Sequence, residues 1–231
     1  MPIAANIEAI ENCIARACLR SGRKREELTL MGVTKFVPAE AVDEAWKAGL
    51  RCFGESRVQE AAAKFENARE QKAGMELHLI GALQRNKAKL AASLFDCIQS
   101  VDRESLVAEL AKHTKERNSP LPLLLEFRTG EDSKSGFTDL GELFRTVELI
   151  LAAPSLSVMG LMTIAPNTGE DKVLRSAFRQ LAKVQKELER RYPAEGRWDC
   201  LSMGMSGDFE TAIEEGSTLL RIGSAIFGER N

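Results

Sequence analysis

Short apolar runs alternate with longer amphipathic stretches along most of this chain. The first stretch repeats isoleucine at helical spacing (Ile3, Ile7, Ile10 and Ile14) and predicts an N-terminal helix. Eight apolar runs then predict strands over 28–33, 51–54, 76–81, 97–101, 122–127, 157–164, 198–203 and 218–223. Amphipathic segments predict helices near 39–48, 57–70, 86–94, 103–116, 139–152, 170–191 and 208–215.

The residues between these elements agree with their boundaries. Asp102 and Asp208 suit helix N-caps, and Pro38 suits the first turn of a helix. Gly49 and Gly216 suit helix ends, where a left-handed residue is common.

Eight strands that alternate with helices favour an α/β fold, a single (β/α)8 TIM-type barrel with an additional N-terminal helix. A doubly wound open sheet is the alternative if either of the short runs 51–54 and 97–101 is not a strand. We find neither an internal repeat nor a linker-like break in composition. One domain over residues 1–231 is therefore expected.

Composition narrows the class of protein. The chain has 32 Lys and Arg residues against 34 Asp and Glu residues, a net charge of −2, which argues against a nucleic-acid partner. The apolar stretch 147–165 is interrupted by Glu148 and Pro154, so it predicts a helix end followed by a strand rather than a membrane span.

The cysteines indicate a reducing compartment. Cys13, Cys18, Cys52, Cys97 and Cys200 are odd in number and form no CxxC pair, which predicts neither a disulfide framework nor a zinc site. The chain has only two histidines, His78 and His113, which disfavours a histidine-based metal site or catalytic triad. Glu8 and Glu11 argue against a transit peptide, and we expect a cytoplasmic protein with reduced thiols.

Lys35 directly follows the first apolar run, in LMGVTKFVP. In a (β/α)8 barrel the carboxyl ends of the strands form the working face, so this amine is placed at the barrel mouth. Partial desolvation favours the neutral form of an amine, and a neutral amine attacks aldehydes to give a Schiff base. A solvated lysine at a strand end is the alternative.

Two turns in the last third of the chain predict an anion site. Ser206, Gly207 and Asp208 follow the seventh strand; Gly223 and Ser224 follow the eighth. Unpaired N–H groups at helix starts bind phosphate, and barrels often bind it after strands 7 and 8. Each turn alone is also typical of ordinary capping. Together with Lys35 they favour a ligand that carries an aldehyde and a phosphate, and pyridoxal 5′-phosphate is such a ligand.

Arg221 lies on the same side of its strand as Gly223, so its guanidinium is expected to face the barrel interior. A buried guanidinium needs a partner. The pyridine nitrogen or a phosphate oxygen would serve, and a salt bridge to a neighbouring carboxylate is the alternative.

These residues resemble a known family, the pyridoxal 5′-phosphate homeostasis proteins, which are related to the N-terminal barrel of alanine racemase. The resemblance rests on GVTKF (32–36), FGESRVQE (53–60), HLIGALQRNK (78–87), GEDSKSGF (130–137), GLMTI (160–164), LSMGMSGDFETAI (201–213) and LLRIGSAIFGER (219–230). It implies an aldimine on Lys35 and phosphate contacts from Ser206, Gly207, Gly223 and Ser224. It also implies that Met203, in the same motif as Ser206, is a cofactor-binding residue. It also implies that Arg221 faces the pyridine nitrogen.

The chain departs from the family pattern at two positions. Ser56 stands where the family usually has asparagine, so a contact near the cofactor ring is expected to be lost or replaced by water. Ala82 replaces a second histidine, while His78 is retained and is expected to be a packed residue rather than a catalyst. Lys134 offers a second amine, which we expect to be solvated.

The resemblance and the residues together predict a carrier rather than an enzyme. The related racemase takes a tyrosine base from a second domain, and the only tyrosine here, Tyr192, lies at a helix end before a proline. Without an opposing base, proton exchange at a substrate α-carbon should be slow. We expect a monomer that buffers the cofactor in vitamin B6 homeostasis, with apoenzymes that require it as candidate recipients. A racemase-like enzyme and a Schiff-base barrel aldolase remain alternatives.

Overall fold

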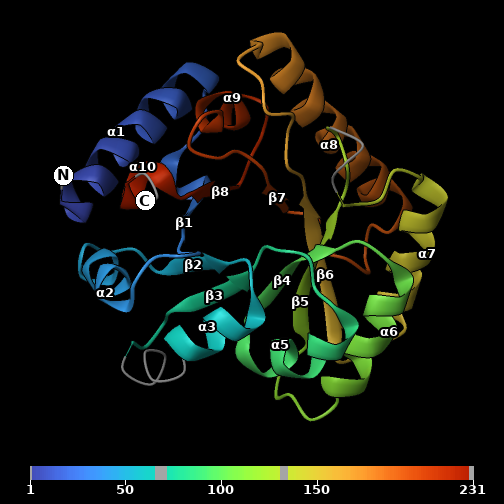
Figure 1. Ribbon diagram of the computed structural model, residues 1–231. Helices are drawn as coiled ribbons and strands as arrows, with labels where there is room; N and C mark the ends of the chain where they lie inside the picture. Colours follow the sequence, from blue (N-terminus) through green and yellow to red (C-terminus); the bar gives the residue numbers. More distant parts are fainter. Residues whose placement is uncertain (1, 66–71, 131–134, 229–231) are drawn as a thin grey trace.

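Parallel strands form a closed barrel in the order β1-β2-β3-β4-β5-β6-β7-β8 in this computed structural model, which describes residues 2–65, 72–130 and 135–228 (Figure 1). The strands are β1 (Thr29–Val33), β2 (Cys52–Glu55), β3 (Glu76–Leu79), β4 (Cys97–Val101), β5 (Leu121–Glu126), β6 (Leu156–Met162), β7 (Cys200–Ser202) and β8 (Leu219–Ile222). The barrel closes through parallel pairing of β8 with β1. The TIM-type barrel is confirmed, and both short runs, 51–54 and 97–101, contain strands.

Helices surround the barrel, with the expected N-terminal helix first. They are α1 (Ile3–Ser21), α2 (Ala39–Lys47), α3 (Val58–Phe65), α5 (Ala88–Leu94), α6 (Glu104–His113), α7 (Leu140–Leu151), α8 (Asp171–Arg191), α9 (Phe209–Glu214) and α10 (Ser224–Phe227). Two single-turn 3-10 helices, Arg25–Glu27 and Arg85–Lys87, precede β1 and α5. Residues 66–70 of the helix predicted over 57–70 lie outside the described residues.

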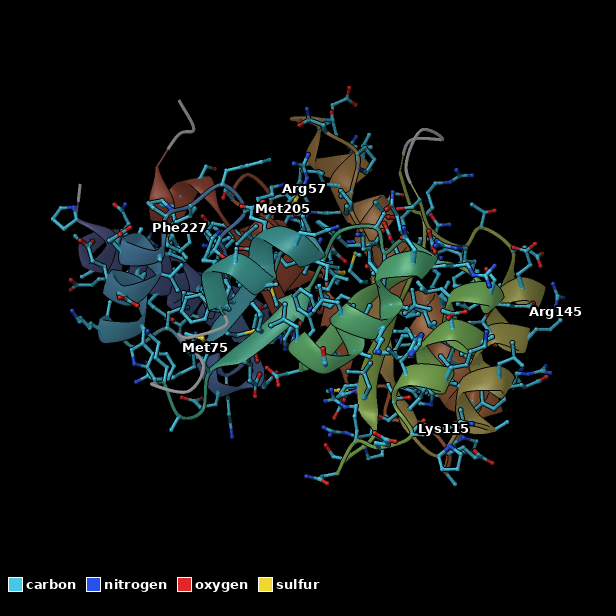
Figure 2. All side chains as sticks on the ribbon, turned by 60° about the horizontal axis from the view of Figure 1, so that its bottom comes forward. Arg57, Met75, Lys115, Arg145, Met205 and Phe227 are labelled. Carbon is cyan, nitrogen blue, oxygen red and sulfur yellow. The ribbon has the colours of Figure 1, made fainter. Side chains whose placement is uncertain are left out.

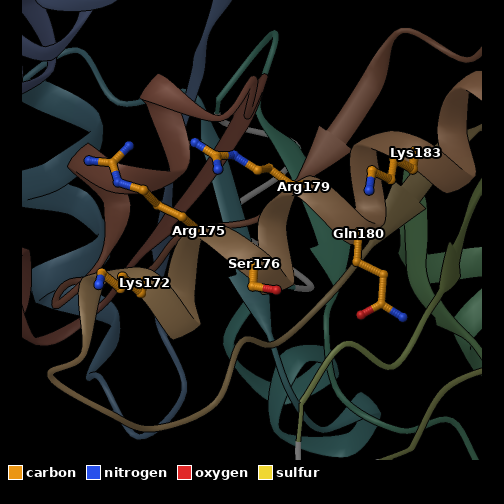
Figure 3. Close-up of a pocket in the computed structure, with 6 residues that line it drawn as sticks. All are labelled: Lys172, Arg175, Ser176, Arg179, Gln180 and Lys183. Carbon is orange, nitrogen blue, oxygen red and sulfur yellow. The ribbon is translucent and has the colours of Figure 1, made fainter.

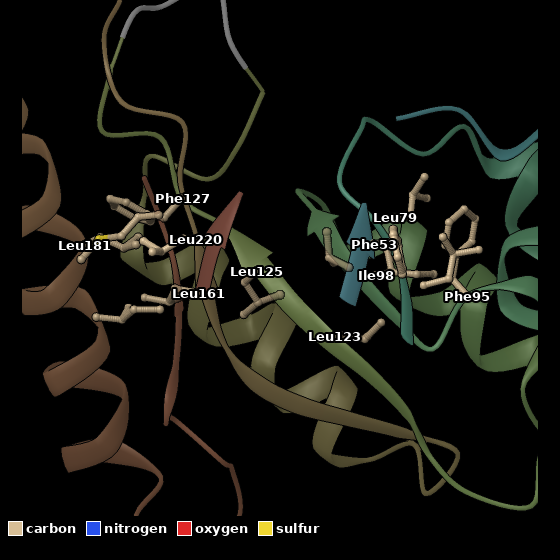
Figure 4. Packing of buried hydrophobic residues seen from close by; sticks show 14 of the residues in the cluster. Phe53, Leu79, Phe95, Ile98, Leu123, Leu125, Phe127, Leu161, Leu181 and Leu220 are labelled. Atoms are coloured by element: carbon tan, nitrogen blue, oxygen red, sulfur yellow. The ribbon is translucent and has the colours of Figure 1, made fainter. Parts of the chain in front are cut away.

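The hydrophobic core lies mainly between the barrel and its helices. Side chains alternate between the two faces of a strand. Phe53, Ile98, Leu123 and Leu125 accordingly lie in the same cluster of buried residues as the apolar faces of the helices (Figure 4). The alternate positions of the strands face the barrel interior, where smaller and more polar groups such as Cys52, Gln99 and Ser202 are found.

Helix α1 covers the part of the barrel where β8 meets β1, and it packs against α9 and α10 (Figure 1). The side-chain amide of Asn6 donates to the carbonyl of Ile226 at 2.8 Å, and Arg20 forms ion pairs with Glu210 and Glu214. The first and last described helices therefore pack together over the part of the barrel where β8 pairs with β1. No described helix has both the length and the apolar content that crossing a membrane requires.

One of the two predicted N-caps is wrong, and the other lacks the side-chain bond of a cap. The N-cap of α6 is Arg103 rather than Asp102, whose carboxylate pairs with Arg103 instead. Asp208 is the N-cap of α9 as expected, but its carboxylate accepts from the N–H of Met205 in the preceding turn. Gly49 and Gly216 do follow helix ends with φ of 98° and 99°, the left-handed region that glycine favours.

Candidate functional site

A cavity of about 400 Å³ opens at the carboxyl ends of the strands. This volume lies in the range of small-ligand pockets. Residues at or beyond the carboxyl ends of six strands line it: Val33, Lys35, Ser56, Ile80, Gly81, Ile164, Met205, Ser206, Gly207, Arg221, Gly223 and Ser224. The structure thus brings together Lys35, Arg221 and both predicted turns, which are far apart in the sequence.

Lys35 lies two residues beyond the end of β1 and is half-buried at the barrel mouth. It lines this cavity and also a neighbouring hollow of about 380 Å³, bordered by Phe36, Pro38 and Phe227. The position expected for the amine is therefore the one observed, at the working face of the barrel.

The turn that carries Lys35 is held by side chains of β2 and α3. Lys64 donates to the carbonyl of Thr34 at 2.7 Å, and Glu55 accepts from the hydroxyl of Thr34 at 2.7 Å. Glu60 accepts from the N–H of Phe36 at 2.6 Å. These contacts fix the backbone on both sides of the lysine.

Phe36 has an unusual conformation within this turn. Its φ is 62°, in the left-handed region that a bulky residue adopts only at a cost, and its ring is 61% exposed. The guanidinium of Arg57 lies 5.5 Å from the ring centroid. Figure 2 labels Arg57 and Met205, two exposed residues beyond the carboxyl ends of β2 and β7. The hydrogen bond from the Phe36 N–H to Glu60 offsets part of the cost of this backbone conformation.

Glu55 and Lys64 form a buried ion pair beneath the same turn. Lys64 Nζ lies 2.7 Å from Glu55 Oε1, and their side chains are 10% and 0% exposed. Burial raises the pKa of Glu55, while hydrogen bonds from Lys64 and Thr34 oppose the shift. The second carboxylate oxygen of Glu55 is buried without a hydrogen-bond partner among the described residues. Lys64 is thus the main group that opposes the rise in the pKa of this carboxylate.

The turns after β7 and β8 lie side by side. The N–H of Ala225 donates to the hydroxyl of Ser206 at 3.4 Å, which links one turn to the other. Among the described residues, none accepts a hydrogen bond from the backbone N–H of Ser206, Gly207 or Ser224. Such N–H groups are suited to an anion.

Arg221 is buried at 4% exposure and reaches the cavity from β8. Its guanidinium donates to Ser202 Oγ and to the carbonyl of Thr163, each at 2.7 Å. Both partners are neutral groups. These contacts therefore do not include the salt bridge to a carboxylate that the sequence offered as an alternative. Burial lowers the pKa of Arg221 to about 10, opposed by the charges of Asp208 and Glu126. The side chain stays a cation at neutral pH, with guanidinium N–H groups at the cavity.

A chain of hydrogen bonds leads from Arg221 down the barrel interior. Ser202 Oγ donates to Gln99 Oε1 at 2.6 Å, and Gln99 Nε2 lies 2.7 Å from His78 Nδ1. His78 does not line the cavity. It is a packed and hydrogen-bonded residue, as expected.

The remaining predicted residues have different positions. Ser56 lines the cavity, whereas Ala82 is exposed and does not. Met203 is fully buried in the hydrophobic core, and it is Met205 that lines the cavity. Lys134 lies outside the described residues.

Sequence reasoning missed the apolar wall of the cavity, formed by Val33, Ile80, Ile164 and Met205. It also missed the Glu55–Lys64 pair. The wall residues could have been found because each one lies at or near the carboxyl end of a predicted strand. The spacing of Glu55 and Lys64 gives no such signal, whereas the i,i+4 spacing of Glu60 and Lys64 predicts an ordinary pair on the helix surface.

A second hollow lies on the outer face of α8 and is lined by Lys172, Arg175, Ser176, Arg179, Gln180 and Lys183 (Figure 3). Its two arginines already pair with α9: Arg175 with Glu214 at 2.7 Å, and Arg179 with Glu215 at 2.7 Å. Only residues of α8 line it, and its two arginines join α8 to the end of α9. The cavity at the barrel mouth is the better candidate site.

Comparison with known proteins defines the class. The family described as "Alanine racemase, N-terminal domain" matches residues 6–231. A curated relative from Vibrio cholerae, named pyridoxal phosphate homeostasis protein, is 43% identical over 232 residues, with 99% of this chain and 97% of the relative covered. The chain therefore belongs to the alanine racemase N-terminal-domain family and, within it, to the pyridoxal phosphate homeostasis proteins.

Solved structures agree with this assignment. An unknown protein from Bifidobacterium adolescentis superposes with a TM-score of 0.90 at 33% identity, covering 98% of this chain and 94% of that one. PipY of Synechococcus elongatus, solved with PLP bound, gives a TM-score of 0.84 at 34% identity, covering 98% of this chain and 100% of its own.

Proposed function

We propose that this protein binds pyridoxal 5′-phosphate in the cavity at the barrel mouth, holds it on Lys35 and acts as a buffer and carrier of the cofactor. The observation that carries the proposal is that Lys35, the two glycine–serine turns and Arg221 line one cavity. The names of the relatives and the PLP-bound PipY structure support it.

The residues of the cavity fit this ligand. The N–H groups of Ser206, Gly207 and Ser224 would bind the phosphate, and Arg221 would offer N–H groups to the ring nitrogen or to a phosphate oxygen. Lys35 Nζ would attack the aldehyde carbon and form an imine, with the carbonyl oxygen leaving as water. Ile80 and Ile164 would contact the ring.

The cavity supports storage of the cofactor rather than catalysis with it. The bound cofactor supplies an electron sink for bonds at an amino-acid α-carbon, but a protein acid or base must move the proton. Among the described residues that line the cavity there is no carboxylate, imidazole or phenol. Tyr192 instead packs against Phe144 and Trp198, and its hydroxyl contacts Glu148 at 3.0 Å.

The deciding experiment is an absorbance spectrum of the purified protein before and after borohydride, followed by mass mapping of the modified lysine. We expect an imine band that borohydride removes, with a phosphopyridoxyl group on Lys35. A colourless protein that remains colourless with added cofactor would overturn the proposal and favour an aldolase. Exchange of the α-proton of an amino acid above the level of Lys35→Ala would indicate a racemase.

Arg221→Gln tests the interior guanidinium. We expect weaker cofactor binding and a shifted imine absorbance, because the cavity loses a cation and its N–H donors. The matched variant Arg197→Gln removes an exposed arginine, paired with Asp199, from the opposite end of the barrel and should leave the spectrum unchanged. An unaltered spectrum and affinity in Arg221→Gln would show that this arginine is purely structural.

Ser206→Ala tests the shared phosphate site. One hydroxyl donor is lost while the backbone N–H groups remain, so binding should weaken by about 1 kcal/mol, roughly fivefold in Kd. Titration of the cofactor-free protein measures this. A loss beyond about a hundredfold would show that the hydroxyl, and not the backbone, carries the site.

A further inference from the structure

The amino-terminal end of the barrel interior holds polar groups that the cofactor site does not use. Barrel interiors are usually filled by bulky branched side chains. Here a cavity of about 580 Å³ opens at this end, with Glu76, His78, Cys97, Leu124, Met159 and Cys200 among the residues that line it. Cys52 lies in the same interior region, in one cluster with Cys200 and Leu219.

Three of these groups bring metal-binding atoms together. Cys52 Sγ, a carboxylate oxygen of Glu76 and a ring nitrogen of His78 all lie within 4.8 Å of one another, and His78 Nε2 is 3.7 Å from Glu76 Oε2. The strands explain this arrangement. Cys52 of β2 is in register with Glu76 of β3, and His78 lies two residues further along the same face of β3.

We propose that Cys52, Glu76 and His78 form a binding site for a divalent transition-metal ion of the zinc class. Zinc bonds to Cys, His and carboxylate ligands are about 2.0–2.3 Å long, which separates tetrahedral ligand atoms by roughly 3.3–3.8 Å. The observed spacing needs only small side-chain movements to reach these values. On binding, the Cys52 thiol releases its proton to solvent, and the sulfur donates to the metal.

The donor set selects the class of metal. Thiolate and imidazole suit zinc and its neighbours, whereas magnesium and calcium prefer oxygen ligands. Three protein ligands leave the fourth position of a tetrahedral ion directed to the cavity, where water fits. Two arginines at the cavity do not oppose a cation strongly, because Arg23 pairs with Glu27 at 3.0 Å and Arg197 with Asp199 at 2.9 Å.

Gln99 contacts the ring nitrogen of His78 that does not face Glu76. A metal-bound imidazole donates its other N–H to an oxygen, which fixes the ring. Gln99 Nε2 lies 2.7 Å from His78 Nδ1. In the metal-bound form the Gln99 amide would make a half-turn, so that its oxygen accepts from His78 Nδ1 and its NH2 donates to Ser202 Oγ, in place of the bond that Ser202 Oγ now donates to Gln99. Gln99 is thus a positioning residue for the metal site, and the site is independent of the cofactor proposal.

Titration of the full, tag-free, reduced chain with Zn²⁺ against a chromophoric chelator, and with Co²⁺ as an optical probe, tests the proposal. We expect one tightly bound equivalent and a thiolate-to-cobalt charge-transfer band. Cys52→Ser should abolish that band. Cys52→Ser and His78→Gln should weaken zinc binding by at least about 100-fold, beyond the roughly 10–100-fold that loss of an outer partner costs in Gln99→Ala.

The chain offers matched controls for these variants. His113→Gln removes the second histidine, which pairs with Glu109 at 3.2 Å on α6, and Cys13→Ser removes a partly exposed thiol of α1. Both should keep the affinity of the parent protein. If His78→Gln fails to fold, Glu76→Gln removes a ligand from a side chain that is 62% exposed. Absence of a tightly bound equivalent in the parent protein, or zinc affinity in Cys52→Ser and Glu76→Gln equal to that of the parent, would overturn the site and leave only a polar cluster.

Discussion

A Lys35→Ala variant is expected to lose the imine absorbance completely while it keeps the circular dichroism of the parent protein. The amine is the covalent anchor in the proposed function, and its half-buried position contributes little to the core. Absorbance after addition of cofactor, and mass spectrometry after borohydride, measure the effect. Residual binding through the phosphate turns is expected, without the covalent adduct.

Lys47→Ala is the matched control, since Lys47 is an exposed lysine at the end of α2. It should retain the parent spectrum. An unchanged imine band in Lys35→Ala would place the covalent bond on another lysine and remove the basis for the function proposed here.

Lys64→Met is expected to lower the free energy of unfolding by about 3–5 kcal/mol, because it leaves the buried carboxylate of Glu55 without its counter-ion. Urea denaturation followed by circular dichroism measures this. The surface lysine Lys112, paired with Glu109 at 2.9 Å, is the control, and Lys112→Met should change stability little.

The sign of the pH dependence identifies the cause. Loss of Lys64 removes the hydrogen bond that lowers the pKa of Glu55, so burial raises that pKa further in the variant. An acid whose pKa is raised on folding costs stability once it ionises. The deficit of Lys64→Met should therefore shrink at mildly acidic pH and in the double variant with Glu55→Gln. A deficit independent of pH would point to lost packing instead.

The barrel could be predicted from the sequence because its signals are local. Eight apolar runs with helices between them leave few topologies, and all eight contain strands in the structure. Lys35 and the two turns were predictable for the same reason, since any residue that directly follows a barrel strand lies at one face.

Contacts between distant segments could not be predicted. Lys64 reads as an ordinary surface lysine of α3, and only the folded chain places it against Thr34 and Glu55. The failure of the Asp102 cap has a local cause instead, because the adjacent Arg103 pairs with its carboxylate. Cys52, Glu76 and His78 have no metal-binding spacing in the sequence, and the register of two strands brings them together.

The pairing of the turns after β7 and β8 has a consequence for synthesis of the protein. Both turns, and the strand that closes the barrel, come after every other strand in the order of translation. A nascent chain can display Lys35 early, yet it lacks half of the proposed phosphate site until Ser224 has left the ribosome. Retention of the cofactor should thus begin only after the barrel has closed.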